Sequence, residues 1–455
     1  MNSPSNSQQP ATLRRQLGLA TATSVVVANM VGAGIFTTTG LILAGLGSGW
    51  VVMLCWLLGG VIALCGALCY AELATMMPRA GGEYVYLGEI YGPQAAFLTG
   101  WISFFAGFSA PIAASAVACA AYLASAGALP KGRFAERATA LAIVALFTML
   151  HYRGVQLGAR VQNALTGLKV LLLVGLVAVG FLRGSGHWDH FARQGGFWEA
   201  GQWSQVGFGM LLVMFAYSGW NASAYLAEEI RQPEKNLPRS LLLGTIIVMV
   251  IYLAVNLLFF FAAPARELSG VTTVGDVAVR GLFGVKAASI FSAAIGLLLL
   301  SSLSAYLLIG PRVYYAMARE GLFFRAAGRV HPRFETPGLA IMAQGLCAMV
   351  LALTGTFEQL LTYIGFALGI FPIMAVAGLI LLRRREPQLE RPYRVWGYPL
   401  VPSVYLAGSM GILLVAFLNR PWPSLSALLT LAAGVPVYRM IVRQIAKRAE
   451  PTVER

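Results

Sequence analysis

The sequence predicts an all-α protein that crosses a membrane many times. Of its 455 residues, 58% are hydrophobic and only 11% are charged, and the mean hydropathy is +0.71. Soluble globular proteins carry roughly 25% charged residues, and a surface with so few charges would aggregate in water. Apolar runs of about 20 residues, the length that a spanning helix needs, recur along the whole chain. The composition therefore excludes a cytosolic enzyme, a disordered protein and a disulfide-stapled secreted domain.

Twelve apolar runs are candidate spanning helices, and the first ten form two sets of five. The first set is predicted at 18–46, 50–77, 95–126, 137–152 and 160–183. The second set is predicted at 205–230, 238–262, 285–317, 338–355 and 358–382. A basic, proline-containing stretch follows, and then two last spans at 401–418 and 421–442. The first run is too long for a signal peptide, so we expect it to remain as a helix.

The distribution of basic residues predicts the orientation. With both termini inside, 23 of the 33 Lys and Arg residues fall on the inside, nine fall on the outside, and Lys169 lies within a span. Cytoplasmic loops of membrane proteins carry such an excess, so the net charge of +15 reports topology rather than nucleic-acid binding. The resulting division is a disordered cytoplasmic N-terminus at 1–16, five-helix sets at 17–183 and 205–382, a cytoplasmic loop at 383–400, peripheral helices at 401–443 and a cytoplasmic tail at 444–455.

Two glycines interrupt the first predicted span, in Val31-Gly32-Ala33-Gly34-Ile35-Phe36. Glycine in a helix costs up to about 1 kcal/mol relative to alanine and bares the backbone. Unwound backbone at mid-membrane is tolerated where it lines a polar cavity, and its free N–H groups could then hold a carboxylate. The alternative is a small-residue face that packs closely against another helix.

A second interruption is predicted in the sixth span, in Phe215-Ala216-Tyr217-Ser218-Gly219-Trp220-Asn221. Ser218 and Gly219 could break the helix, and Asn221 could cap its second half. The first and sixth spans each open a set of five, and glycine-interrupted segments in matching positions indicate a transporter's binding site. The predicted substrate-binding residues are Val31, Gly32, Ala33, Gly34, Ile35, Phe215, Ala216, Ser218 and Gly219.

Lys169 is an ionisable residue within the fifth predicted span. Such residues are functional candidates, and the expected partners are the carbonyls freed where the first span unwinds. The ammonium there could do the electrostatic work of a bound sodium ion, or the amine could release its proton. The alternative is that the side chain snorkels to the cytoplasmic interface, because Arg160 lies only about two turns away.

Acidic residues are missing from the middles of spans 1, 3, 5, 6, 8 and 10. A cationic substrate needs a carboxylate partner in a pocket of low dielectric, so the absence favours a neutral substrate. Glu72, Glu228 and Glu229 lie near predicted cytoplasmic ends, where we expect a structural or gating role. Their expected partners are Arg79, Arg231 and Lys235.

Together with these motifs, further segments carry a resemblance to the amino acid–polyamine–organocation (APC) superfamily, and within it to bacterial relatives of the L-type amino acid transporters. These segments are Tyr70-Ala71-Glu72-Leu73, Pro78-Arg79-Ala80-Gly81-Gly82-Glu83-Tyr84, Glu228-Glu229, Pro311-Arg312-Val313-Tyr314-Tyr315, Ala318-Arg319-Glu320-Gly321 and Tyr398-Pro399. The resemblance implies a LeuT-type fold of two inverted five-helix repeats plus two peripheral helices, with helices 1 and 6 discontinuous.

The resemblance also implies roles for individual residues. The substrate carboxylate would lie on the backbone around Ala33 and Gly34, and its amino group would face carbonyls near Val31 and of span 6 around Phe215 and Ser218. Phe215 resembles the aromatic residue that closes over the substrate. Lys169 resembles the family's lysine in the second sodium site of sodium-coupled relatives. Ala33 departs from the pattern, because many relatives have serine there.

The expected function is secondary active transport of neutral L-amino acids, by exchange or with protons, across a bacterial inner membrane and by alternating access. The sequence has no P-loop, HExxH or nucleophile elbow, so we expect no enzymatic activity, cofactor or metal, and a monomer in the bilayer. Alternatives are a cationic amino acid or polyamine antiporter, proton-coupled uptake of another small amine metabolite, and a receptor or channel-like protein without transport.

Overall fold

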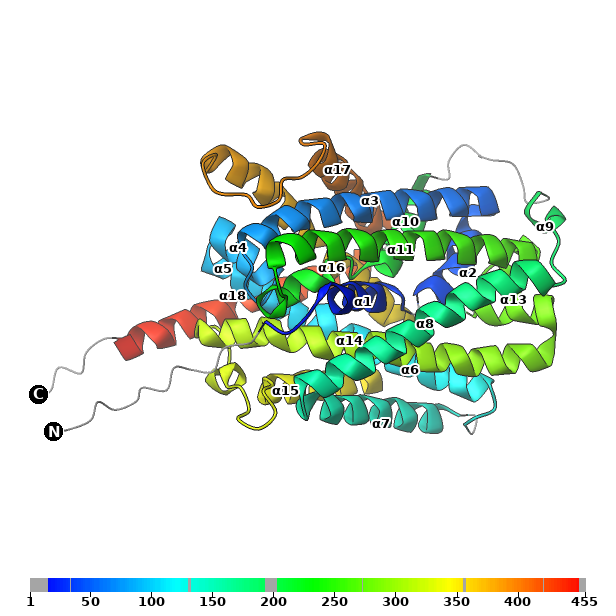
Figure 1. Ribbon diagram of the computed structural model, residues 1–455, viewed down its shortest axis with the longest axis horizontal. Coiled ribbons are helices and arrows are strands. Elements are labelled where there is room, and N and C mark those ends of the chain that lie inside the picture. The colour runs from blue at the N-terminus through cyan, green and yellow to red at the C-terminus, as the bar shows by residue number, and fades with distance from the viewer. Residues whose placement is uncertain are drawn as a thin grey trace, which may run out of the picture.

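The computed structural model describes residues 15–32, 34–129, 132–192, 203–271, 273–354, 357–419 and 421–449. Helices dominate this part of the chain, and most of them run along the long axis of the molecule (Figure 1). Within it the only extended pairing is an isolated bridge between Leu17 and Ile230. The predicted all-α class is therefore confirmed.

The first half of the chain begins with two short helices in place of one long one. Its elements are α1 (Leu19–Met30), α2 (Gly34–Leu46), α3 (Gly49–Met76), α4 (Glu83–Tyr91), α5 (Pro93–Ile102), the π-helical segment η1 (Ser103–Ser109), α6 (Ala110–Ser125), α7 (Arg133–Tyr152), α8 (Val155–Arg183) and α9 (Asp189–Ala192). Gly92, with a φ of +92°, makes the corner between α4 and α5. Pro93 then begins α5, at a position where a missing N–H costs no helical hydrogen bond.

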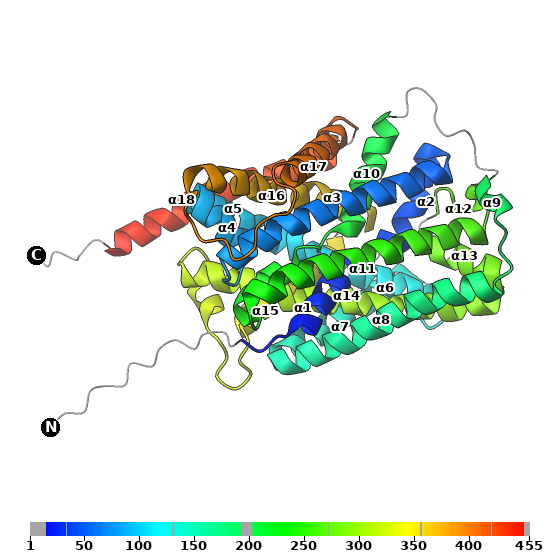
Figure 2. The same cartoon turned by 45° about the horizontal axis from the view of Figure 1, so that its top comes forward.

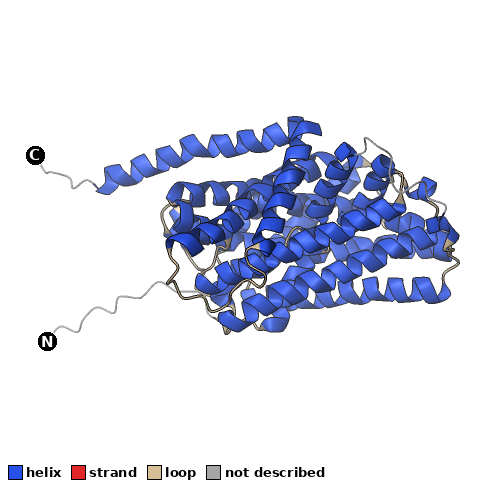
Figure 3. Ribbon diagram, turned by 90° about the horizontal axis from the view of Figure 1, so that it is seen from above, coloured by secondary structure: helices blue, strands red, loops and turns tan. Residues whose placement is uncertain are grey.

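The second half also opens with an interrupted helix. Its elements are α10 (Trp203–Tyr217), the 3₁₀ helix η2 (Ala222–Glu229), α11 (Pro233–Ala262), α12 (Ala265–Leu268), α13 (Val274–Phe283), α14 (Val285–Arg319), the 3₁₀ helix η3 (Arg325–Gly328), α15 (Gly338–Thr354), α16 (Phe357–Arg385), α17 (Leu400–Asn419) and α18 (Pro421–Ala449). Seen from above, the helix that leads to the C-terminus lies along the outside of the bundle (Figure 3).

Ten segments of the described chain are long and apolar enough to cross a membrane. They are Leu19–Leu46, Gly49–Met76, Pro93–Ala124, Arg133–Tyr152, Arg160–Arg183, Pro233–Ala262, Val285–Arg319, Ile364–Arg385, Leu400–Asn419 and Ser424–Arg443. The predicted span 205–230 is not among them, because α10 has only 15 residues. The predicted span 338–355 is the shorter apolar helix α15, with 17 residues. The protein is thus a multi-pass membrane protein.

Large apolar side chains are exposed on the outward faces of several helices. Leu171 and Leu182 of α8 are 69% and 79% exposed, and Ile290 of α14 is 74% exposed. In water such an exposed apolar surface would promote aggregation, whereas in a bilayer it contacts lipid tails that are equally apolar. The outward faces of these helices are therefore suited to contact with lipid.

The interrupted helices lie inside the bundle. α1 packs against α8, α11 and α14, and both views show it next to α11 (Figures 1 and 2). α10 packs against α2, α3 and α17. Seven of the twelve residues of α1 are buried, including Asn29 at 2% exposure. The core of the molecule thus holds both segments that the sequence singled out.

Candidate functional site

The chain leaves the helical conformation at Val31, where φ is −75° and ψ is +86°. The N–H of Val31 still donates to the Val27 carbonyl, but the N–H of Gly32 donates to the Met30 carbonyl instead of continuing the helix. The last carbonyls of a helix have no intrahelical partner and need others. Ala33 lies outside the described residues, and the next helix begins at Gly34.

Lys169 of α8 supplies the nearest partner for these carbonyls. Its Nζ donates to the Val31 carbonyl and to Ser302 Oγ at 2.8 Å, and lies 3.4 Å from the Ala28 carbonyl. These three acceptors match the three N–H groups of an ammonium. The residue is only 1% exposed, so its side chain points into the bundle and does not reach the cytoplasmic interface.

Two tyrosines hold the remaining carbonyls at the end of α1. The Tyr252 hydroxyl lies 2.5 Å from the Met30 carbonyl and 2.9 Å from the Ala216 carbonyl, so it bridges α1 and α10. The Tyr306 hydroxyl donates to the Asn29 carbonyl at 3.1 Å. The sequence analysis missed these residues, as it missed Ser302. Polar side chains in the middle of apolar runs are the signal that could have found them.

The second interruption follows α10, where residues 218–221 separate Tyr217 from η2. Gly219 has a φ of +97°, and a Cβ there would lie 2.7 Å from the Asn29 Cβ. A Cβ on Gly34 would likewise lie 2.7 Å from the Ala216 Cβ. Only glycine allows such a close approach. The two interruptions are therefore in direct contact with each other.

A small cavity lies where the interruptions meet. Of the predicted binding residues, Gly32, Gly34, Phe215, Ala216 and Ser218 line it. Its other lining residues are Asn29, Met30, Pro111, Ala114, Ser115 and Tyr306. Val31 and Ile35 are buried but are not among its lining residues. Val31 instead contributes the carbonyl that Lys169 holds.

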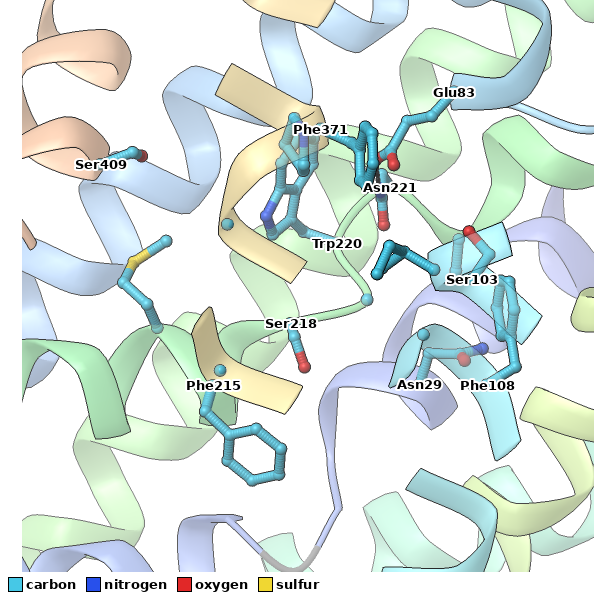
Figure 4. A pocket seen from close by; sticks show the side chains of 18 of the residues that line it. Asn29, Glu83, Ser103, Phe108, Phe215, Ser218, Trp220, Asn221, Phe371 and Ser409 are labelled. Carbon is cyan, nitrogen blue, oxygen red and sulfur yellow. Dashed lines mark hydrogen bonds between the residues drawn. The ribbon is translucent and has the colours of Figure 1, made fainter. Parts of the chain in front are cut away.

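A larger cavity continues from the small one, and Asn29, Phe215, Ser218 and Tyr306 line both. Gly219, the last predicted binding residue, lines this larger cavity. Figure 4 shows Phe215 and Asn29 toward one end and Glu83, Asn221 and Trp220 toward the other. Aromatic and small side chains dominate its wall, as is common for small-molecule sites.

Glu83 corrects one premise of the sequence analysis. No carboxylate was expected at the pocket, yet Glu83 lines the larger cavity and is 5% exposed. Its Oε1 accepts hydrogen bonds from the Tyr70 hydroxyl and from Asn221 Nδ2, both at 2.6 Å. The prediction failed because Glu83 lies between two predicted spans and not within one. Glu83 begins α4, which lies between the spanning segments Gly49–Met76 and Pro93–Ala124 and folds back against the cavity.

Burial raises the pKa of Glu83 to about 7, and hydrogen bonds from Tyr70, Tyr225 and Asn221 oppose that rise. Desolvation disfavours the carboxylate more than these neutral donors stabilise it. The group therefore changes charge near neutral pH.

The partners expected for Glu72, Glu228 and Glu229 were wrong. Arg79 pairs instead with Glu89, and the observed partners come from segments far along the chain. Glu72 lies 2.5 Å from Arg383 and 3.3 Å from Arg391 and also accepts from the Val395 N–H at 2.7 Å. Glu229 pairs with Arg312 at 3.0 Å, and Glu228 lies 3.9 Å from Arg319. Helix packing therefore brings each of these glutamates to an arginine that is distant in the sequence, and not to the basic residues near it in the chain.

Comparison with known proteins gives consistent similarities. A family model described as "Amino acid permease" matches residues 17–437. The chain is 30% identical over 436 residues to the Asc-type amino acid transporter 1 of Mus musculus, covering 94% of this chain and 81% of that one. It is 30% identical over 434 residues to the serine/threonine exchanger SteT of Bacillus subtilis (strain 168), covering 94% and 96%. It is 29% identical over 432 residues to the large neutral amino acids transporter small subunit 2 of Mus musculus, covering 94% and 81%.

Proposed function

This chain belongs to the amino acid permease family, and on that premise we propose that it is a secondary transporter of neutral L-amino acids. The family and the relatives are amino acid transporters and not enzymes, as the sequence analysis predicted. The observation that carries the proposal is the contact between two helix interruptions at a buried cavity. Helices broken at mid-membrane around a shared site are the arrangement that transporters use.

The small cavity suits the common part of an amino acid. The first N–H groups of α2, near Gly34, have no intrahelical partner, and the helix dipole favours a carboxylate there. The carbonyls at the end of α10, including that of Phe215, can accept from an ammonium group. The small side chains at Gly32, Gly34 and Ala216 leave room for a zwitterion. The amino acid's own side chain would then extend into the larger cavity, past Phe215.

We propose that the two interrupted helices also provide alternating access to the cavity. We propose a LeuT-type architecture of twelve helices, in which α1–α2 and α10–η2 are the discontinuous helices of two inverted five-helix repeats. These two interrupted helices move against the remaining scaffold, and Phe215 closes over the substrate. Lys169 holds the unwound end of α1 as a fixed cation, which replaces a sodium ion. Glu72, Glu228 and Glu229 lock the cytoplasmic side through their arginine partners.

The surroundings proposed for the protein follow the charge distribution. We propose a bacterial inner membrane with both termini in the cytoplasm, because this orientation would put 23 basic residues on the cytoplasmic side against nine on the other. It acts as a monomer and binds an amino acid, with or without a proton.

A cationic amino acid or polyamine is the second candidate substrate. The observation that favours it is the Glu83 carboxyl in the wall of the larger cavity. Against it, that carboxyl already accepts from Tyr70 and Asn221. A cationic group would have to share the carboxyl with those two donors.

Uptake into proteoliposomes tests the proposal. Radiolabelled alanine, serine and leucine are offered to vesicles with and without unlabelled amino acid inside, and arginine and putrescine are added as competitors. We expect uptake of at least one neutral amino acid and weak competition by both cations. Strong competition by arginine or putrescine would instead identify the cationic substrate. No uptake or exchange of any amino acid by folded protein refutes the proposal.

A further inference from the structure

Glu83 differs from the other deeply buried carboxylates of the described chain. Glu72 and Glu229, at 0% and 3% exposure, each pair with an arginine. Glu83 is 5% exposed, and within the described residues no Lys, Arg or His side chain forms an ion pair with it. An unpaired buried carboxylate is unfavourable by several kcal/mol unless it binds a cation or a proton. A proton or a cation bound at Glu83 would therefore be stabilising.

The groups around Glu83 are almost all neutral. α3 presents Tyr70, η2 presents Tyr225, α17 presents Tyr405, and α4 itself presents Tyr86. The residues of α5, which packs against α4, include no titratable side chain. α16 also packs against α4 and has its arginines, 383–385, in its last turn. Of these, Arg383 is held by Glu72.

Hydrogen bonding links the charge of Glu83 to the segment proposed to move. Asn221 follows the turn at Ser218 and Gly219, and its side-chain amide donates to Glu83 at 2.6 Å. A carboxylate is the stronger acceptor, and a protonated carboxyl donates from one of its oxygens. Protonation therefore weakens the hold of α4 on the α10–η2 turn and removes a buried charge beside the cavity.

Lys169 offers no comparable change. Its Nζ has three acceptors for the three N–H groups of an ammonium, and two of them belong to the unwound end of α1. Loss of its proton would remove one of the three hydrogen bonds that Nζ donates and would leave the Val31 carbonyl only the hydrogen bond from the Ser302 hydroxyl. The geometry makes Lys169 a fixed cation and leaves Glu83 as the group that can exchange a proton through the cavity.

Resting on the proposed function, we propose that Glu83 is the proton-binding residue that couples proton movement to amino acid transport. One proton adds to the carboxylate when the cavity faces the more acidic side, and the same proton leaves when the cavity faces the other side. No other bond forms or breaks. Because burial raises the pKa of Glu83 to about 7, both charge states are accessible near neutral pH.

Glu83→Gln tests this coupling, because glutamine keeps the shape and an acceptor oxygen but binds no proton. Glu89→Gln is the matched control, since Glu89 lies on the same helix with its side chain 54% exposed and paired with Arg79. Radiolabelled alanine uptake is driven by an acid-outside pH gradient into proteoliposomes without internal amino acid. Exchange at equal pH, with alanine inside, is measured in parallel across the neutral range.

We expect wild-type protein and Glu89→Gln to accumulate alanine under the gradient. Glu83→Gln should accumulate at least tenfold less alanine than wild type under the gradient. It should still exchange alanine at equal pH, and the rate of that exchange should no longer vary with pH. Gradient-driven accumulation by Glu83→Gln at the wild-type level overturns the proposal. So does a wild-type protein that exchanges alanine but ignores the gradient, and that result leaves the proposed function intact. Failure of all uptake and exchange by folded wild-type protein refutes the proposed function itself.

Tyr70→Phe keeps the proposal testable if Glu83→Gln does not fold. Tyr70 donates to the carboxylate and stabilises its charged form. Its removal raises the pKa of Glu83 further, so the pH midpoint of exchange should move to higher pH. An unchanged or lower midpoint overturns the proposal. Loss of arginine competition in Glu83→Gln with intact gradient-driven alanine uptake also overturns it, and would assign the carboxyl to recognition of a cationic substrate.

Discussion

Replacing Lys169 by methionine removes the ammonium from the centre of the bundle and keeps a side chain of similar length. The ammonium donates to the Val31 carbonyl and to Ser302, and lies 3.4 Å from the Ala28 carbonyl. Methionine fills the same space without any donor. The variant therefore separates the charge of this residue from its packing.

The magnitude follows from these contacts. A hydrogen bond to a charged group contributes about 1.5–3 kcal/mol, and the burial of an ammonium costs several kcal/mol. The substitution removes the favourable hydrogen bonds and the unfavourable burial of the charge together. We therefore expect the free energy of unfolding to change by no more than about 2 kcal/mol. Transport is affected more, because the unwound end of α1 loses its anchor in one state of the cycle. One charged hydrogen bond made in only one state corresponds to a loss of roughly 10- to 100-fold in rate.

Initial rates of alanine uptake into proteoliposomes measure the change in transport rate, and thermal unfolding of the purified protein measures the change in stability. Lys286→Met is the matched control, because it removes a lysine that is exposed at the end of α14. The control should transport at the wild-type rate. Turnover by Lys169→Met within twofold of wild type, in protein that is folded and correctly inserted, would refute the role given to the ammonium.

Four further substitutions have defined outcomes. Gly34→Ala places a Cβ 2.7 Å from α10, about 0.7 Å inside the 3.4 Å of ordinary contact, and should abolish alanine uptake. Gly32→Ala has no atom nearer than 3.7 Å to its added Cβ and should lower the unfolding temperature less than Gly34→Ala, so an equal drop in the two variants contradicts the close approach. Arg312→Met leaves the Glu229 carboxylate buried without its partner and should lower stability by about 3–5 kcal/mol, read from thermal unfolding. Burial raises the pKa of Glu83 from 4.5 to about 7, so the folded protein holds this proton more tightly than the unfolded chain does. The resulting stabilisation is fully present below pH 4.5 and is lost as the pH rises through 7. Glu83→Gln should flatten this pH dependence of the unfolding temperature, and an unchanged slope would show that another group causes it.

Much of the fold was predictable, because spanning helices are recognised by length and hydropathy alone. Both segments with interruptions, around Gly34 and Gly219, were named from their glycines. The prediction was less good where helices are short. The run at 205–230 contains an α-helix of only 15 residues and a 3₁₀ helix of 8, because the chain turns at Gly219 with a positive φ. Hydropathy averages over such a turn and does not detect it.

The candidate site was predictable only in part. Lys169 could be found because a charge inside an apolar run is conspicuous. The place of Glu83 at the cavity could not be predicted, because it lies in a segment between two spans. The partners of Glu72 and Glu229 were also beyond reach, since nearby arginines such as Arg79 and Arg231 offered equally plausible pairs in the sequence.

The sequence by itself determined the membrane class, the family, the positions of both interruptions and the presence of one charge within a span. These properties depend on composition and on residues close together in the chain. Only the tertiary structure decided which groups meet. Lys169 and Val31 are 138 residues apart, as are Glu83 and Asn221, and Glu72 and Arg383 are 311 apart. Such contacts depend on how each helix is rotated and which helices are neighbours. That choice is made by close packing of whole faces and by the need of buried polar groups for partners, and no local pattern records it.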